Sequence, residues 1–249
     1  MAVTASAEAQ MQILDVQAID TKIMQLKHKH ANFPEHAMVK DLEVALGSLD
    51  LQIVAAQTQC SDLEVLVRKA ENDVEQVVMR TKRDQERLDS GSVTSSKDLE
   101  SLQHEIASLG VRQRELEDAE LEVLERLEEA QKILAQLQSS HAQTSVELDQ
   151  TRDQLASKTS DIDNQISECE AQRSQAVNGL PQDFLDLYNK VRTDLGGVGA
   201  AMLHRAQCQG CHIALDASEL NRIRSLASDV VVRCEQCRRI LVRTAESGL

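Results

Sequence analysis

The chain has 249 residues, a formal net charge of -14, and only three aromatic residues, none of them tryptophan. So few aromatics exclude an ordinary globular core of this length, whereas 41% apolar and 27% charged residues favour long amphipathic helices. The sequence has no apolar run of eighteen residues and no signal-peptide pattern at its start, so we expect a cytoplasmic protein without membrane contact.

Two helices are predicted in the first third of the chain. The first covers residues 5–31, where apolar positions recur every three or four residues from Val16 to Leu26 and the same stripe continues through His30 to Phe33. Pro34 ends this helix, because a residue before proline avoids the α region. The second covers residues 38–88 and holds eleven consecutive uncharged heptad core positions, which is typical of a coiled coil. These positions are Leu42, Leu46, Leu49, Ile53, Ala56, Cys60, Leu63, Val67, Ala70, Val74 and Val77.

Residues 89–96 are rich in serine and glycine, and we expect them to form the tip of a hairpin. Ser96 is the predicted N-cap of a third helix, residues 97–177. This helix is about as long as the first two together, so we expect an antiparallel hairpin whose returning arm spans both.

The core stripe of the third helix is predicted to run from Leu99 to Cys169. Its second half includes the polar positions Lys158 and Gln165, so we expect looser packing there. Cys169, like Cys60, falls on a core stripe and is interpreted as a small apolar residue. His141 has no partner at helical spacing, so it is interpreted as a register-setting or half-exposed residue rather than a ligand.

A linker follows, residues 178–199, in which glycine and proline end the coil. A short amphipathic helix is predicted at residues 182–193, with Phe184 and Tyr188 packing the C-terminal domain against the base of the hairpin. The run Gly196-Gly197-Val198-Gly199 predicts a turn; it matches no phosphate-loop pattern.

The C-terminal domain, residues 200–249, contains two Cys-x-x-Cys pairs separated by 22 residues. Four thiolates in two such pairs are the usual ligands of a tetrahedral structural Zn²⁺ ion, so we predict one zinc bound by Cys208, Cys211, Cys234 and Cys237. The alternatives are redox dithiols or disulfides, which fit less well because neither pair lies in a thioredoxin-like pattern. Strands are predicted at 201–205, 230–233 and 239–243, with one or two helical turns at 218–226, which is the layout of a zinc ribbon.

A site with four cysteines leaves no coordination position for an activated water, and the sequence has no hydrolase motif, so we expect no enzymatic activity. Residues 1–199 carry 20 basic and 36 acidic residues, so nucleic acid would be repelled there, and any contact would be local. Residues 200–249 have seven arginines against five acids. Each Cys-x-x-Cys pair forms a tight turn, here called a knuckle. Clustered arginines beside a zinc knuckle are candidate nucleic-acid or partner contacts, with an ordinary solvated role as the alternative. The candidates are Arg222, Arg224, Arg233, Arg238, Arg239 and Arg243.

Several segments resemble a bacterial family of long coiled-coil hairpins followed by a four-cysteine zinc ribbon. The resemblance lies in residues 87–91, 97–106, 116–118, Tyr188 with Val191-Arg192, 208–212 and 234–241. One departure is Arg238, where the family usually has glycine. The resemblance implies an adaptor, since members have been linked to an alternative sigma factor of RNA polymerase, to messenger RNA and to secretion components.

The sequence thus predicts a mostly α protein: a coiled-coil hairpin at 1–177 with a break near 32–37, the linker, and a zinc ribbon at 200–249. We expect a non-enzymatic adaptor for protein partners, a sigma factor or another transcription component among the candidates. A nucleic-acid-binding regulator that uses the ribbon arginines is the alternative. The sequence does not select an oligomeric state.

Overall fold

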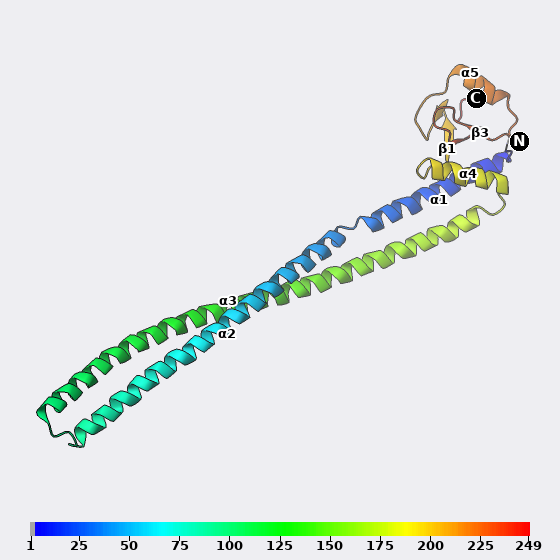
Figure 1. Cartoon of the computed structure of the whole chain (residues 1–249). Coiled ribbons are helices and arrows are strands. Elements are labelled where there is room, and N and C mark those ends of the chain that lie inside the picture. The colour runs from blue at the N-terminus through cyan, green and yellow to red at the C-terminus, as the bar shows by residue number, and fades with distance from the viewer. Residues whose placement is uncertain (1–2) are drawn as a thin grey trace. The chain divides into compact units, whose positions relative to one another are not determined.

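The structure is a computed structural model that describes residues 3–249. The chain divides into two compact units, one formed by Ala37–Arg152 and the other by the chain up to His36 together with Asp153–Leu249. Figure 1 shows that long helices and a small C-terminal region with strands make up the protein. The predicted fold class is confirmed: a long helical hairpin followed by a small four-cysteine ribbon.

In the unit Ala37–Arg152, parts of two long helices pair as an antiparallel hairpin (Figure 1). The helices are α2, Pro34–Asp89, and α3, Ser96–Ala176. All eleven predicted core positions of α2 are buried or half-buried, and Cys60 and Leu63 pack on Ala130 of α3. His141 is half-exposed, as predicted, and its Nε2 lies 3.1 Å from Asp50 Oδ1.

Most helix boundaries lie within two residues of the prediction, but the predicted roles of Pro34 and Ser96 differ from those in the structure. Helix α2 begins at Pro34, four residues earlier than predicted, because proline lacks an N–H and has a fixed φ that suits the first position of a helix. Pro34 therefore starts one helix directly after the preceding one ends. Ser96 lies inside α3, and the carbonyl oxygen of Ser95 accepts the first bond, from the Leu99 amide.

The predicted core stripe of α3 is wrong at Lys158 and Gln165. Both side chains are exposed, and Thr159 and Ile166 are half-buried instead. Two consecutive steps of four residues, from 151 to 155 and from 155 to 159, move two core positions by one residue, from 158 to 159 and from 165 to 166, while Leu155, Ile162 and Cys169 keep their predicted places. Such a stutter occurs because 3.6 residues per turn does not match a strict heptad. The shift leaves Lys158 on the surface, where it pairs with Glu35.

In the other unit, helix α1, Ala7–Ala31, packs on the C-terminal part of α3. Ile23, Leu26 and Phe33 share a core cluster with Ile162 and Cys169. Since α3 pairs with α2 in one unit and with α1 in the other, its returning arm does span both earlier helices, as predicted.

The ribbon contains a four-stranded sheet of strand order β2-β1-β4-β3. The strands are β1, Ala200–His204; β2, Gln207–Cys208; β3, Val232–Arg233; and β4, Ile240–Val242. Strand β1 is parallel to β4, and the other two pairings are antiparallel. Helix α5, Ala217–Ser225, connects the two knuckles; the Asp216 carboxylate caps it by accepting from the Glu219 amide. Sequence reasoning missed β2, which has two residues and no pattern of its own.

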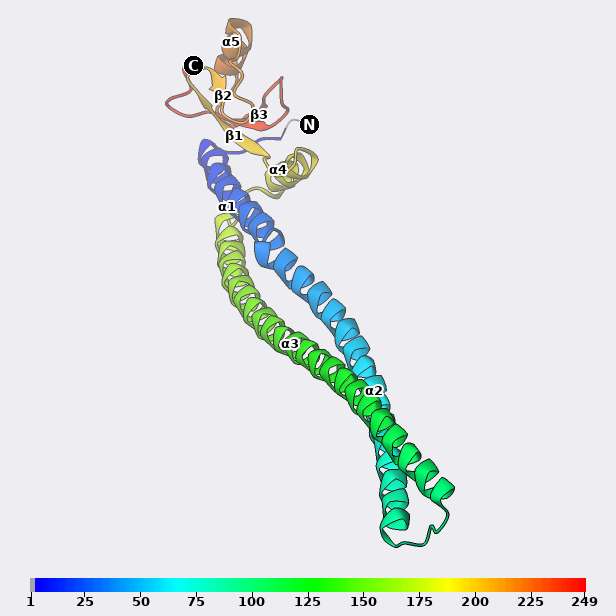
Figure 2. The ribbon, with the colours of Figure 1, turned by 90° about the vertical axis from the view of Figure 1, so that its left-hand side faces the viewer.

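A shared core joins the ribbon to the helices of its unit. Helix α4, Gln182–Asp194, lies beside β1 (Figure 2). Its fully buried Phe184 and Tyr188 meet Ile13 and Val16 of α1 and Ile240 of β4, which confirms their predicted role. The unit that contains the ribbon therefore also includes α4 and α1, because the ribbon, α4 and α1 bury one set of side chains together.

Candidate metal centre

The two knuckles bring four sulfur atoms together. All four Sγ atoms of Cys208, Cys211, Cys234 and Cys237 lie within 4.8 Å of one another. The Cys208–Cys237 and Cys211–Cys234 sulfurs are each 3.9 Å apart. Tetrahedral Zn–S bonds of about 2.3 Å place sulfurs about 3.8 Å apart, so the arrangement fits a zinc ion. Among the residues that the structure describes, it is the only such group, and none of the six cysteines forms a disulfide.

The burial of the sulfurs couples metal binding to deprotonation. Burial raises the pKa of the Cys208 thiol to about 12 and also raises the pKa of Cys234. Burial acts in the same direction on Cys237, but the Arg239 amide and other donors lower the pKa of that thiol. Neighbouring thiolates would repel one another without a cation, and zinc supplies the charge that holds all four deprotonated. A zinc ion bound by this arrangement would stabilise the folded ribbon. Because cysteine sulfurs fill all four ligand positions, no position is left for a water or a substrate.

Neither nearby histidine joins the cluster. His204 Nε2 lies 3.3 Å from Glu246 Oε2, away from the sulfurs. His212 follows the first knuckle, and its carbonyl oxygen accepts a bond from the Gln207 side chain. These positions agree with a site made from cysteine alone.

Each knuckle ends in a residue with left-handed backbone. His212, directly after Cys211, has φ 59°, and Arg238, directly after Cys237, has φ 65°. The Arg238 amide donates to the Cys234 carbonyl oxygen and closes the second turn. The second knuckle therefore has the turn that glycine favours, although arginine occupies the position.

Arg238→Gly is expected to stabilise the ribbon by up to about 1 kcal/mol, since left-handed backbone penalises a Cβ by somewhat more than glycine adds in unfolded-state entropy. The measurement is zinc release to a coloured chelator during heating of the full chain. Arg224→Gly, inside helix α5, is the control and should lower the release temperature. Equal shifts in both variants would contradict the argument.

The six candidate arginines separate into structural and exposed groups. Arg239 donates to the carbonyl oxygens of Val198 and Gly210, so it ties the second knuckle to the first. Arg243 donates to four carbonyl oxygens between residues 226 and 230, at the end of α5. Arg222 pairs with Glu235 at 3.0 Å. Arg224, Arg233 and Arg238 are exposed, as Arg222 is, although Arg233 Nε also donates to the Arg238 carbonyl oxygen at 2.8 Å.

Gly210 in the first knuckle is required by close packing. A Cβ there would lie 2.7 Å from Arg239 Cδ and 2.9 Å from Ala201 Cβ. The absence of a side chain lets the Arg239 guanidinium reach the Gly210 carbonyl oxygen. Sequence reasoning found the cysteines but missed this contact, because Arg239 and Gly210 are far apart in the chain.

A buried polar network, also missed, joins α1 to α4 and to the start of the ribbon. The Asp20 side chain, 1% exposed, accepts from Tyr188 Oη at 2.7 Å and lies 2.7 Å from Arg173 Nε and 2.6 Å from Arg192 Nη1. Burial and the bond to Asp20 raise the pKa of Tyr188, so its hydroxyl stays protonated. Gln17 Oε1 accepts from the amides of Gly199 and Ala200, which precede and begin β1.

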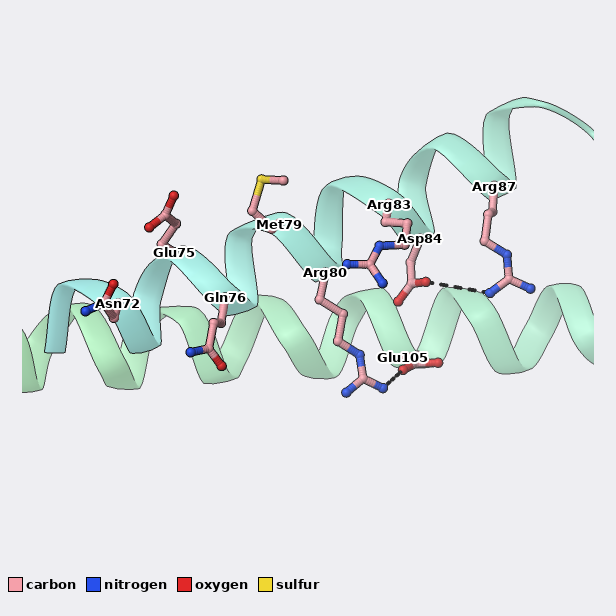
Figure 3. Close-up of a pocket in the computed structure, with 9 residues that line it drawn as sticks. All are labelled: Asn72, Glu75, Gln76, Met79, Arg80, Arg83, Asp84, Arg87 and Glu105. Atoms are coloured by element: carbon pink, nitrogen blue, oxygen red, sulfur yellow. Dashed lines mark hydrogen bonds and ion pairs between the residues drawn. The ribbon is translucent and has the colours of Figure 1, made fainter. Parts of the chain in front are cut away.

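Near the hairpin tip, a second cluster of charged residues lines a hollow between α2 and α3 (Figure 3). Arg80 pairs with Glu105, and Arg87 Nη1 lies 3.8 Å from the buried Asp84. Arg83 is the third arginine of the hollow, which also contains Glu75. Three arginines and three acids leave the hollow without net charge, so charge alone selects no ligand.

Fold and site together define a class of protein: a coiled-coil hairpin that carries a four-cysteine structural zinc ribbon. The model of the CT398-like coiled coil hairpin domain matches residues 16–196, and that of the C4-type zinc ribbon domain matches residues 207–241. The chain belongs to the CT398-like coiled-coil hairpin family. The predicted resemblance and the single structural zinc are thereby confirmed.

Curated relatives and solved structures extend over nearly the whole chain. The uncharacterized protein Rv2229c of Mycobacterium tuberculosis is 32% identical over 246 residues, covering 96% of this chain and 97% of the relative. A solved structure from Mycobacterium smegmatis has 28% identity and a TM-score of 0.79, and covers 97% of this chain and 100% of that one.

More distant structures share the fold alone. CT398 from Chlamydia trachomatis has a TM-score of 0.64 at 17% identity, with 95% of this chain and 98% of that chain covered. The HP0958 protein from Helicobacter pylori has a TM-score of 0.50 at 14% identity, with 96% and 98% covered. No helix within residues 3–249 combines the length and hydropathy needed to cross a membrane.

Proposed function

We propose that the protein is a non-enzymatic adaptor that binds protein partners through its zinc-stabilised ribbon and its hairpin, in regulation linked to transcription. A sigma factor is one candidate partner, and the cytoplasm is the expected location. Support comes from the closed coordination of the metal site, in which four sulfurs lie within 4.8 Å of one another and leave no position for a substrate.

The ribbon also has a surface that could bind a partner and is held in place by the helices packed on it. Gln17 and the shared core tie it to α1 and α4, while Arg224, Arg233 and Arg238 extend from its surface. A small platform fixed to a helical support can present such side chains without rearrangement, which lowers the entropy cost of binding.

The proposal predicts that partner capture depends on the folded ribbon. Lysate proteins captured by the intact protein should be lost when Cys234→Ser is used as bait, as measured by quantitative mass spectrometry. Cys60→Ser, which alters a buried cysteine of the hairpin, is the control and should retain them. Identical or empty partner sets for the intact and Cys234→Ser baits would count against the adaptor.

Nucleic-acid binding through the ribbon is a second candidate function. Arg233 and Arg238 are exposed, and together with Cys234 and Glu235 they line a hollow of about 290 Å³. Four thiolates and one zinc ion add a charge of -2, however, which offsets the excess of arginine in residues 200–249.

Titration of RNA and DNA oligonucleotides at several salt concentrations tests this candidate. A regulator should retain sequence preference at physiological salt, and Arg233→Ala with Arg238→Ala should reduce the salt slope by about two. Weak binding without sequence preference at physiological salt would exclude it.

A further inference from the structure

Helix α2 has a second, uncharged stripe on the side opposite to its coiled-coil seam, and four of its seven positions are large apolar residues. If Leu42 and Leu46 are heptad core positions d and a, the outward positions b and f from 44 to 65 carry no charge in seven consecutive cases. They are Val44, Gly47, Leu51, Val54, Thr58, Ser61 and Val65. Outward positions of a two-helix coiled coil are ordinarily polar. The stripe departs from this pattern, and its large apolar side chains do not belong to the seam that packs on α3.

The four large side chains of this stripe are exposed in the structure. Val44 is 67% exposed, Leu51 75%, Val54 59% and Val65 54%. No heavy atom lies within 4 Å of a Cβ built on Gly47, so the face is open there as well. The stripe lies within the unit Ala37–Arg152 and extends for about 32 Å at 1.5 Å per residue. Its length and spacing match the face of a further helix.

The charges that α2 itself places beside the stripe have one sign. Between residues 41 and 67 there are five acidic residues and no lysine, arginine or histidine. In the heptad all five occupy positions c or e, the two flanks of the b and f stripe. Glu43 and Asp50 are paired with Arg152 and His141 of α3, whereas Asp41, Asp62 and Glu64 form no ion pair within the described chain.

We propose that this surface, the Val44–Val65 stripe with its acidic flanks, binds an amphipathic helix of a partner protein. That helix has apolar residues at alternating steps of three and four, flanked by lysine or arginine. A second copy of the same stripe fits less well, since it would bring acidic flanks against acidic flanks. The inference deepens the proposed adaptor function, on which it rests, by assigning a class of partner to the hairpin rather than to the ribbon.

The test uses the zinc-loaded full chain and two synthetic helical peptides of about 22 residues, the length of the stripe. Both have leucine at the apolar positions; one has lysine and the other glutamate on the flanks. The lysine peptide should bind at least about tenfold more tightly than the glutamate peptide, and Leu51→Lys with Val54→Lys should weaken it at least about tenfold. Fluorescence anisotropy measures the affinities.

A matched control separates the stripe from the general acidity of the protein. Leu121→Lys with Val146→Lys adds the same charge at two α3 side chains of similar exposure, 58% and 56%, and should change the affinity by less than about twofold. Asp62→Asn with Glu64→Gln should weaken binding without removing apolar contact. Circular dichroism confirms that each variant retains its helices.

Three results would overturn the inference. They are absence of lysine-peptide binding, equal weakening by both pairs of lysine substitutions, and a dimer in sedimentation equilibrium that Leu51→Lys with Val54→Lys dissociates. The last would assign the stripe to a second copy of the chain. Since none of these measurements depends on the ribbon, failure here leaves the Cys234→Ser capture experiment as an independent test of the adaptor.

Discussion

Replacing Cys234 with serine is expected to remove zinc from the protein and unfold the ribbon. The ribbon has about fifty residues, too few for a self-sufficient core, and structural zinc supplies an apparent binding free energy of about 10–16 kcal/mol. Zinc content by atomic emission should fall from about one ion per chain to near zero.

The loss of structure should extend beyond the ribbon but not through the whole chain. Because Ile240 and Ala200 share a core with Phe184 and Tyr188, amides of α4 should lose hydrogen-exchange protection together with those of the strands. Amides of residues 37–152 should retain theirs, since that unit has its own core. Protection lost evenly over both units would contradict this division.

Cys60→Ser is the matched control for the metal. It makes the same chemical change at a buried cysteine that packs on α3 rather than joining the sulfur cluster. Its zinc content should remain at about one ion per chain. Stoichiometric zinc in Cys234→Ser would contradict the four-cysteine site.

Acid should release zinc from the unaltered protein, because protons compete for the thiolates as the pH falls.

Asp20→Ala is expected to destabilise the unit that contains the ribbon by about 2–4 kcal/mol, since removing one partner of a buried ion pair leaves the other uncompensated. The carboxylate is 1% exposed and holds Arg173, Arg192 and Tyr188. The side chains of the two arginines are 24% and 32% exposed, so water reduces the cost below that of a fully buried pair.

Urea unfolding followed by circular dichroism and by zinc release measures this effect. Asp20→Asn retains an acceptor for Tyr188 without the charge and should fall between Asp20→Ala and the unaltered protein. Asp15→Ala, at an exposed position of the same helix, is the control and should change stability by less than about 0.5 kcal/mol. If Asp20→Ala were no more destabilising than Asp15→Ala, the network would have no structural role.

Local pattern was sufficient for much of the fold. A short stretch of sequence was enough to predict each of four features, because helical spacing and knuckle spacing are local properties. They are the heptad positions of α2, the tip, the helix at 182–194 and the two Cys-x-x-Cys pairs. The same reasoning failed at Lys158 and Gln165, where a stutter moved each core position by one residue. It also placed the start of α2 too late, since Pro34 was interpreted only as an end.

The amino-acid sequence by itself determined a zinc-carrying helical hairpin, since the spacing of apolar residues and cysteines acts over only a few residues. Tertiary structure alone decided which polar side chains are structural. Asp20 meets Arg173 across 153 residues, and Arg239 reaches Gly210 across 29, whereas the Arg238 side chain remains exposed. A buried polar group must find a partner wherever the fold brings one, and no local period encodes that position.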